Sequence, residues 1–129
     1  MVLVDTSVWI DLFSTSPSLT VPVEKLPLLV TCNPVIQEIL QGIRDQKAFQ
    51  KVKTGMLSLR NIMETIPLDV YLHAADIYRA GRLKGLTIRS SVDCLIAAIA
   101  LRNNLVLWHK DRNFDAIAKY TELRVIQGL

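Results

Sequence analysis

Three short runs of the sequence consist almost entirely of apolar residues: VLV at 2–4, LLVT at 28–31 and LVLW at 105–108. A strand with apolar residues on both sides is buried on both faces, which is typical of the parallel sheets of α/β proteins. The long segments between these runs leave room for the helices that must connect parallel strands. The sequence therefore predicts an α/β fold with a central, mainly parallel β-sheet flanked by helices.

The segments between the apolar runs carry helical signals. Segments suited to helices lie at residues 6–14, 34–43, 45–59, 69–82, 92–104 and 112–120. Two further strands are expected at residues 64–68 (ETIPL) and 123–127 (LRVIQ). A length of 129 residues suits one domain, which we expect to span residues 1–129.

The distribution of apolar residues also indicates in which cellular compartment the protein acts. No stretch approaches the roughly 20 apolar residues of a membrane span, and Met1 leads into the first strand without the basic segment of a signal peptide. We therefore expect a cytoplasmic protein with no membrane partner. In that compartment Cys32 and Cys94 are expected to be buried thiols. Trp9 and Trp108 are expected in the core or an interface.

Four acidic residues hold related places in the predicted fold. Asp5 and Asp111 follow strands, Glu38 lies about a turn into a helix that follows a strand, and Asp93 opens a long helix. The carboxyl ends of parallel strands form the edge of a sheet where ligands bind. Each acid also has a structural explanation. Asp5 and Asp111 suit helix N-caps, Asp93 follows Ser90 at capping-box spacing, and Glu38 could be a surface residue.

Taken together, the four acids point to a metal. Carboxylates brought close together repel one another and have raised pKa values unless a cation neutralises them. Oxygen ligands without a Cys or His set favour Mg²⁺ or Mn²⁺, which activate water and stabilise a leaving oxygen in phosphodiester hydrolysis. If these four acids are set aside, the rest of the chain has fifteen Lys and Arg residues and eight acids. This surplus of positive charge attracts phosphates.

The sequence resembles the PIN-domain ribonucleases, and within them the VapC-type toxins of bacterial toxin–antitoxin pairs. The matching segments are VDTSVWID, NPVIQEIL, RSSVDCLIAAIA and LWHKDRNFDAIA. The resemblance implies a Mg²⁺-dependent endoribonuclease, with Mn²⁺ as a substitute, that leaves a 5′-phosphate on one product. It implies the catalytic acids Asp5, Glu38, Asp93 and Asp111, of which Asp5, Asp93 and Asp111 ligate the metal.

Further residues gain expected roles from the same resemblance. Ser7 matches a hydroxyl position that helps to order the site, although it could also be a second hydroxyl at a helix start. Asn113 stands where many relatives carry a fifth acid. It can support the site by hydrogen bonding but brings no charge to a second metal ion. Asp11 is expected to support the site from outside, and Asp115 to lie on a helix surface.

Basic residues near the acids are candidates for binding RNA. Arg89 precedes the helix of Asp93, and Lys110 and Arg112 flank Asp111, so all three could hold RNA phosphates. The alternative for each is ordinary solvated surface charge. His109 is expected to be a structural or rim residue.

The resemblance also implies partners. These are an RNA substrate such as tRNA or rRNA, a second copy of the chain in a homodimer, and a small VapB-like antitoxin. The antitoxin would insert a helix and a basic residue into the acidic groove. Two alternatives remain from the sequence: a housekeeping nuclease for RNA processing, and a PIN module that binds RNA or protein without cutting.

Overall fold

The structure is a computed structural model that describes residues 1–129. Its five strands form one sheet in the order β3-β2-β1-β4-β5, and every neighbouring pair is parallel. The strands are β1 (Val2–Val4), β2 (Leu29–Thr31), β3 (Arg60–Asn61), β4 (Val106–Trp108) and β5 (Val125–Ile126). The predicted α/β fold with a parallel central sheet is therefore confirmed.

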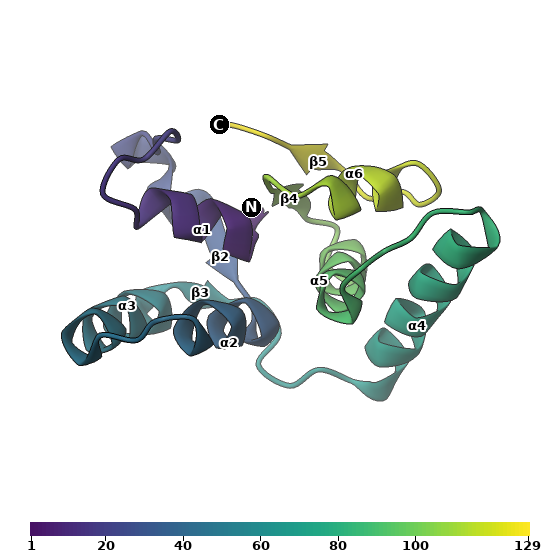
Figure 1. Cartoon of the computed structure of the whole chain (residues 1–129), viewed down its shortest axis with the longest axis horizontal. Coiled ribbons are helices and arrows are strands. Elements are labelled where there is room, and N and C mark those ends of the chain that lie inside the picture. Colours follow the sequence, from purple (N-terminus) through teal and green to yellow (C-terminus); the bar gives the residue numbers. More distant parts are fainter.

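Helices connect all the strands. They are α1 (Thr6–Leu12), the 3₁₀ helix η1 (Val23–Leu28), α2 (Asn33–Gln41), α3 (Gln46–Ser58), α4 (Leu68–Leu83), α5 (Ser91–Arg102) and α6 (Arg112–Ala118). In Figure 1 helices α1 to α3 gather on the left and α4 to α6 on the right, with the strands between them. None of the helices has the length and hydropathy that crossing a bilayer requires.

The register of the central strands brings the carboxyl ends of β1 and β4 side by side. Val4 of β1 lies opposite Trp108 of β4, so the two strands end at the same level. The ladder continues one residue further, because the Asp5 N–H donates to the Trp108 carbonyl at 2.9 Å. Since β2 lies on one side of β1 and β4 on the other, the chain reverses its winding here, and this is where open α/β sheets bind ligands.

A continuous apolar core surrounds the sheet. Leu3, Val30 and Leu107 of the three central strands are fully buried, and so is the segment of α5 from Ile96 to Ala100. Burial of such residues is the main favourable contribution to folding. The expectations for the cysteines and tryptophans are also confirmed, since Cys32, Cys94, Trp9 and Trp108 are all buried and both cysteines are free.

The predicted strand at residues 64–68 is wrong. The third strand is instead Arg60–Asn61, which pairs with Val30 and Thr31 of β2. Pro67 is the N-cap of α4, and proline has no N–H to contribute to a ladder. The true strand is a polar pair at the edge of the sheet, so it lacks the apolar run that revealed the inner strands.

Gly81 allows α4 to pack closely against Tyr120, two residues beyond the end of α6. The Tyr120 hydroxyl donates to the Ile77 carbonyl at 2.7 Å, and a Cβ on Gly81 would lie only 2.7 Å from that hydroxyl oxygen. We expect Gly81→Val to lower the free energy of unfolding by about 1–3 kcal/mol, because the extra methyl groups overpack this contact. Urea unfolding measures the change.

Gly55 provides the matched control for this substitution. It lies in α3, and nothing lies within 4 Å of the position that its Cβ would occupy. Gly55→Val should therefore change stability by less than about 0.5 kcal/mol, as expected from the similar helix propensities of exposed valine and glycine. Equal stabilities of the two variants would contradict the close packing at Gly81.

Candidate metal centre

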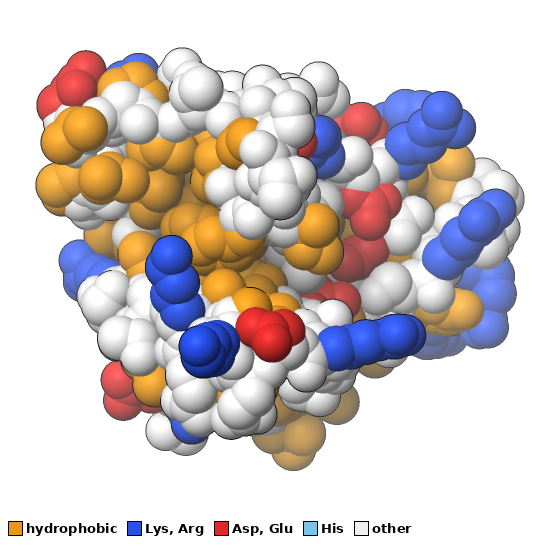
Figure 2. Space-filling model, turned by 60° about the vertical axis from the view of Figure 1, so that its left-hand side comes forward, with side chains coloured by type: hydrophobic (Ala, Val, Ile, Leu, Met, Phe, Trp, Pro, Cys, Tyr) orange, Lys and Arg blue, Asp and Glu red, His pale blue; other side chains and the backbone are white.

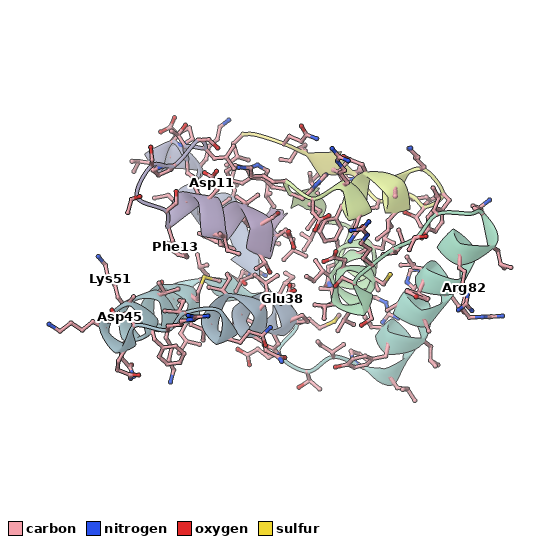
Figure 3. The ribbon with its side chains drawn as sticks, in the orientation of Figure 1. Asp11, Phe13, Glu38, Asp45, Lys51 and Arg82 are labelled. Carbon is pink, nitrogen blue, oxygen red and sulfur yellow. The ribbon has the colours of Figure 1, made fainter.

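Four acids from four elements converge beyond the carboxyl ends of β1 and β4. Asp5 caps α1, Asp111 caps α6, Asp93 lies in the first turn of α5, and Glu38 lies in α2. Asp5, Glu38 and Asp93 each offer a carboxylate oxygen within 4.8 Å of the other two. Asp111 is near enough for its charge to raise the pKa of those three carboxyls. Sequence reasoning left a surface role open for Glu38, but the residue is partly buried and its carboxylate lies near those of Asp5 and Asp93. Figure 3 labels Glu38 on α2.

Helix capping uses only part of each carboxylate. One oxygen of Asp5, Oδ2, accepts from the Ser7 N–H at 3.0 Å and the Ser7 hydroxyl at 2.6 Å. Its other oxygen, Oδ1, is buried and has no hydrogen-bond partner. In Asp111, Oδ1 accepts from the Asn113 N–H at 2.9 Å. A buried oxygen without a partner is unfavourable, so capping leaves Oδ1 of Asp5 available to a ligand.

Two neutral side chains hold the remaining acids in place. The Thr6 hydroxyl donates to Oε1 of Glu38 at 2.8 Å. The Asn113 amide donates to Oδ2 of Asp93 at 2.8 Å, so Asn113 contacts Asp93 through its side chain and Asp111 through its backbone. Sequence reasoning identified Ser7 and Asn113 but missed Thr6. The only sequence signal for Thr6 was its place between Asp5 and Ser7.

Burial and mutual repulsion raise the pKa values in this cluster. Burial is the main cause for Asp5, Glu38 and Asp93, and the neighbouring carboxylates add to it. The pKa of Asp93 rises to about 7, although the hydrogen bond from Asn113 opposes the rise. The metal-free cluster therefore tends to retain protons near neutral pH. A group of oxygen ligands with one unpartnered buried oxygen fits a hard divalent cation.

A second hydrogen-bond network fixes the loop after α1 outside the cluster. The Ser7 hydroxyl accepts from the Lys110 N–H at 3.0 Å while it donates to Asp5. The Lys110 ammonium donates to Oδ2 of Asp11 at 2.6 Å and to the Ser18 hydroxyl at 3.2 Å. Hydrogen bonds from Lys110 and Ser18 hold the pKa of Asp11 well below its usual range. Asp11 thus lies outside the acid cluster, and the Lys110 ammonium is already paired.

His109 contacts the fourth acid from within the core. Its side chain is fully buried, and its Nδ1 accepts from the Asp111 N–H at 3.0 Å. The proton therefore lies on Nε2, which is 3.1 Å from Oδ1 of Asp115 on α6. The hydrogen bond from the Asp111 N–H to the buried His109 ring holds the backbone of Asp111 in place. Sequence reasoning did not assign this contact.

We expect two substitutions of His109 to differ in metal binding. Asparagine can place an acceptor near the position of Nδ1, whereas glutamine places its polar group near Nε2. His109→Gln should weaken Mn²⁺ binding by about 10-fold or more, the usual effect of losing a group that orients a ligand, and His109→Asn should retain most of the affinity. Isothermal titration measures both. Equal affinities in the two variants would argue against this role.

Comparison with known proteins identifies the family. A family model described as the PIN domain matches residues 2–120. The chain is 38% identical over 133 residues to Ribonuclease VapC11 of Mycobacterium tuberculosis, with 96% of each chain covered. The chain is a PIN-domain protein of the VapC family.

Solved structures agree with this PIN fold. The structure of VapBC-1 from nontypeable Haemophilus influenzae matches with a TM-score of 0.72 and 18% identity, covering 98% of this chain and 97% of the other. VapBC2 from Rickettsia felis, bound to a DNA fragment from its promoter, matches with a TM-score of 0.73 and 16% identity, covering 98% of each chain. At such identities these two structures show the fold alone.

A basic depression adjoins the acids of this PIN domain on the Asp111 side. It encloses about 600 Å³ and is lined by Ser7, Arg89, Lys110, Asp111, Arg112 and Asn113. All three basic residues predicted from the sequence thus border one depression. The side chains of Arg89 and Arg112 make no hydrogen bond or ion pair within the protein, unlike Lys110. In Figure 2 acidic side chains gather in a hollow, with basic side chains on one side and apolar surface on the other.

An apolar groove adjoins the acids on the Glu38 side. It lies between α1, α2 and α3 and encloses about 330 Å³. Its lining includes Ile10, Phe13, Ile39, Ile43, Val52 and Glu38. Ile10 and Phe13 are exposed although they are large and apolar. Such surface is typical of protein interaction sites.

Proposed function

We propose that this VapC-family chain is a Mg²⁺-dependent endoribonuclease that hydrolyses phosphodiester bonds of RNA. The observation that carries the proposal is the buried, unpartnered oxygen of Asp5 where the carboxylates of Asp5, Glu38 and Asp93 meet. Relatives named as ribonucleases, with 38% identity over 96% of their length, support the reaction type. The cytoplasm is the compartment in which we propose that it acts.

The proposed roles follow from the contacts. Asp5, Asp93 and Asp111 would hold the ion, and Glu38, fixed by Thr6, would complete the acidic site. Of these acids, Asp5, Glu38 and Asp93 offer oxygens within 4.8 Å of one another, and Asp111 lies beside that group. The ion would supply a water of lowered pKa and would stabilise charge on the phosphate and the leaving oxygen. Ser7 and Asn113 orient the acids through the hydrogen bonds described above.

The test is cleavage of total bacterial RNA by the purified chain, free of any antitoxin, with Mg²⁺ or with EDTA. The Asp93→Asn variant, purified identically, controls for contaminating ribonuclease. We expect discrete fragments only from the wild type with metal, and sequencing of the new 5′ ends identifies the target. Identical patterns from both proteins would refute the nuclease and favour a PIN module that binds RNA or protein without cutting.

We further propose that the chain is the toxin of a VapBC-type pair and is inhibited by a small VapB-like antitoxin. The solved relatives titled VapBC support such a partner. The apolar groove borders Glu38, so an apolar helix lying in it could extend an arginine into the acids. The guanidinium would replace the charge of the metal and form paired hydrogen bonds with carboxylates.

Expression without the partner tests the toxin proposal. Wild-type protein should arrest bacterial growth, and Asp93→Asn should not. Harmless expression of a wild-type protein that cuts RNA in vitro would instead favour a housekeeping RNA-processing nuclease. We also propose a homodimer, which light scattering should detect as twice the mass of one chain.

A further inference from the structure

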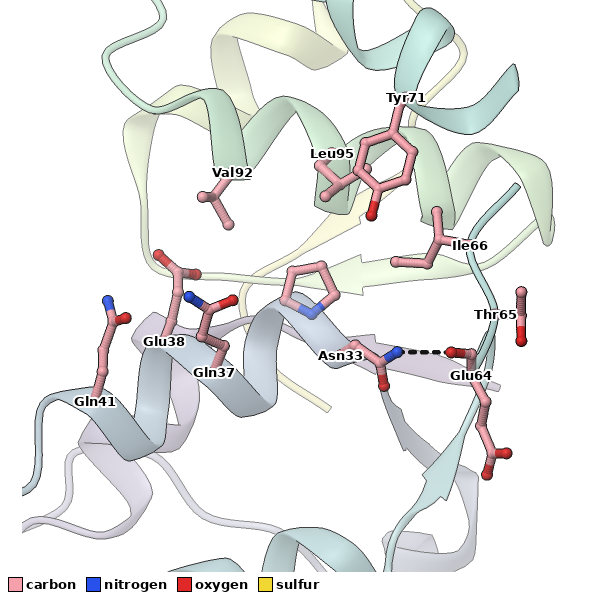
Figure 4. A pocket seen from close by; sticks show the side chains of 11 residues that line it. Asn33, Gln37, Glu38, Gln41, Glu64, Thr65, Ile66, Tyr71, Val92 and Leu95 are labelled. Atoms are coloured by element: carbon pink, nitrogen blue, oxygen red, sulfur yellow. Dashed lines mark hydrogen bonds between the residues drawn. The ribbon is translucent and has the colours of Figure 1, made fainter. Parts of the chain in front are cut away.

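A second pocket shares Glu38 with the acid cluster and is here called the amide pocket. It encloses about 460 Å³ between α2, α5, the start of α4 and residues 64–66. Figure 4 shows Gln37, Glu38 and Gln41 rising from α2 on one side, and Val92 and Leu95 reaching down from α5 on the other. Tyr71 of α4 projects into the same space. The pocket has the size and mixed lining of a small-molecule site.

The lining of the amide pocket suits an uncharged, planar, polar group. None of its eleven residues is Lys or Arg and two, Glu38 and Glu64, are acidic, so the pocket disfavours a phosphate. The amides of Gln37 and Gln41 can both donate and accept, and neither makes a hydrogen bond within the protein. Val92, Leu95 and the Tyr71 ring offer apolar surface. Stacking together with hydrogen bonds to a base edge is how proteins bind unpaired RNA bases.

The far wall of the pocket is fixed before any ligand binds. The Asn33 amide donates to the Glu64 carbonyl at 2.8 Å, and its Oδ1 accepts from the Asn61 amide at 2.6 Å. Asn33 therefore serves to hold the segment after β3 against α2 and is not free to read a ligand. A pocket that is already formed loses less conformational entropy on binding.

The two depressions lie on different sides of the acid cluster and differ in charge. The basic depression reaches the cluster at Asp111 and carries the unpaired Arg89 and Arg112. The amide pocket reaches it at Glu38, and Val92 in its wall directly precedes Asp93. A phosphodiester at the acids would thus have cationic side chains for the RNA backbone on one side and a pocket without cationic side chains on the other.

We propose that the amide pocket binds the base of a nucleotide next to the scissile phosphate and thereby sets the base preference of cleavage. The inference rests on the proposed ribonuclease function. An antitoxin segment is a less suitable occupant, because an apolar helix fits the apolar groove between α1, α2 and α3 better than a pocket lined by amides.

The first experiment uses NMR of the full chain with Mg²⁺. The probes are AMP, CMP, GMP and UMP, with ribose 5-phosphate as a probe that has a phosphate but no base. We expect the side-chain amide signals of Gln37 and Gln41 to shift with at least one nucleotide and to stay unchanged with ribose 5-phosphate. Equal shifts with ribose 5-phosphate, or none with any nucleotide, would overturn the proposal.

The second experiment maps cleavage of a random-sequence RNA pool. Gln37→Ala and Gln41→Ala should each reduce discrimination between bases at the cut by about 5-fold or more, as expected when hydrogen bonds that read a base are lost. Gln50→Ala is the matched control, since Gln50 is an exposed glutamine on α3 outside the pocket. Tyr71→Phe should keep the preference because the ring remains, and Tyr71→Leu should reduce it.

The outcomes separate the two proposals. A wild type that cuts no RNA would refute the ribonuclease function itself. A wild type that cuts, with glutamine variants that keep its base preference, would refute only the base pocket. Unchanged preference combined with weaker binding of a cognate antitoxin would show that the pocket contacts a protein partner instead, and would likewise overturn the proposal.

Discussion

The Asp93→Asn variant is expected to lose RNA cleavage by about a thousandfold or more and yet to melt at a higher temperature than the metal-free wild type. On the proposed function, the loss of activity follows because the metal would supply several kcal/mol of transition-state stabilisation and the variant would lose one of its charged ligands. The fold should persist, since asparagine can still accept the hydrogen bond from Asn113 and the Asp93 N–H keeps its bond to Ser90.

The gain in stability follows from the raised pKa of Asp93. Burial and neighbouring carboxylates raise this pKa to about 7, so at pH 8 the folded chain without metal holds a charge that its surroundings disfavour. Removal of that charge should stabilise the folded state by about 1–2 kcal/mol after allowance for screening by nearby solvent, or about 3–6 °C in Tm. Calorimetry in EDTA measures the change. A Tm several degrees below that of the wild type would instead assign Asp93 mainly to the start of α5.

Divalent metal affinity is expected to fall by about 10-fold for each pH unit below 7. Below its pKa of about 7 Asp93 is protonated, so the ion must displace a proton in order to bind. The pKa values of Asp5 and Glu38 are also raised, which can add further protons at lower pH. Mn²⁺ titrations at pH 6, 7 and 8 measure the slope. An affinity independent of pH in this range would contradict the raised pKa.

The same titration predicts how the metal-free chain responds to pH. A carboxyl whose folded-state pKa is raised favours the folded state at low pH, and its contribution is lost as pH rises from the unfolded value near 3.8 to about 7. The Tm in EDTA should therefore fall between pH 5 and pH 8. Asp11 and Asp69 have lowered pKa values and stay ionised throughout this window, so they do not oppose the trend. Asp93→Asn should show a flatter profile.

The sequence predicted those parts of the site that depend on strand ends. Asp5 and Asp111 follow apolar strands, and parallel strands bring their carboxyl ends to one edge whatever the strand order. For Glu38 the spacing was ambiguous, because helical periodicity identifies the face toward the core but not the face toward a neighbouring helix terminus. The contact from Thr6 to Glu38 spans 32 positions and has no local pattern.

Other features depended on tertiary context. The edge strand Arg60–Asn61 is held by pairing with β2, and its own residues have low strand propensity. The role of His109 depends on a backbone N–H two residues later, and a lone histidine after a strand gives no hint of that contact. Sequence reasoning treated capping and metal binding as alternatives for Asp5, whereas Oδ2 serves as the cap and Oδ1 remains without a partner, so the two roles are compatible.

The central position of β1 also determines when the acidic site can form. Val2 and Leu3 pair with Val106 and Leu107, so β1 gains its second neighbouring strand only after β4 has been synthesised. Contacts between distant parts of a chain form slowly, and synthesis delivers the N-terminal part first. A nascent chain that ends before β4 lacks Asp111 and the ladder bond from Asp5 to Trp108. The acidic site can therefore form only after β4 and Asp111 have been synthesised.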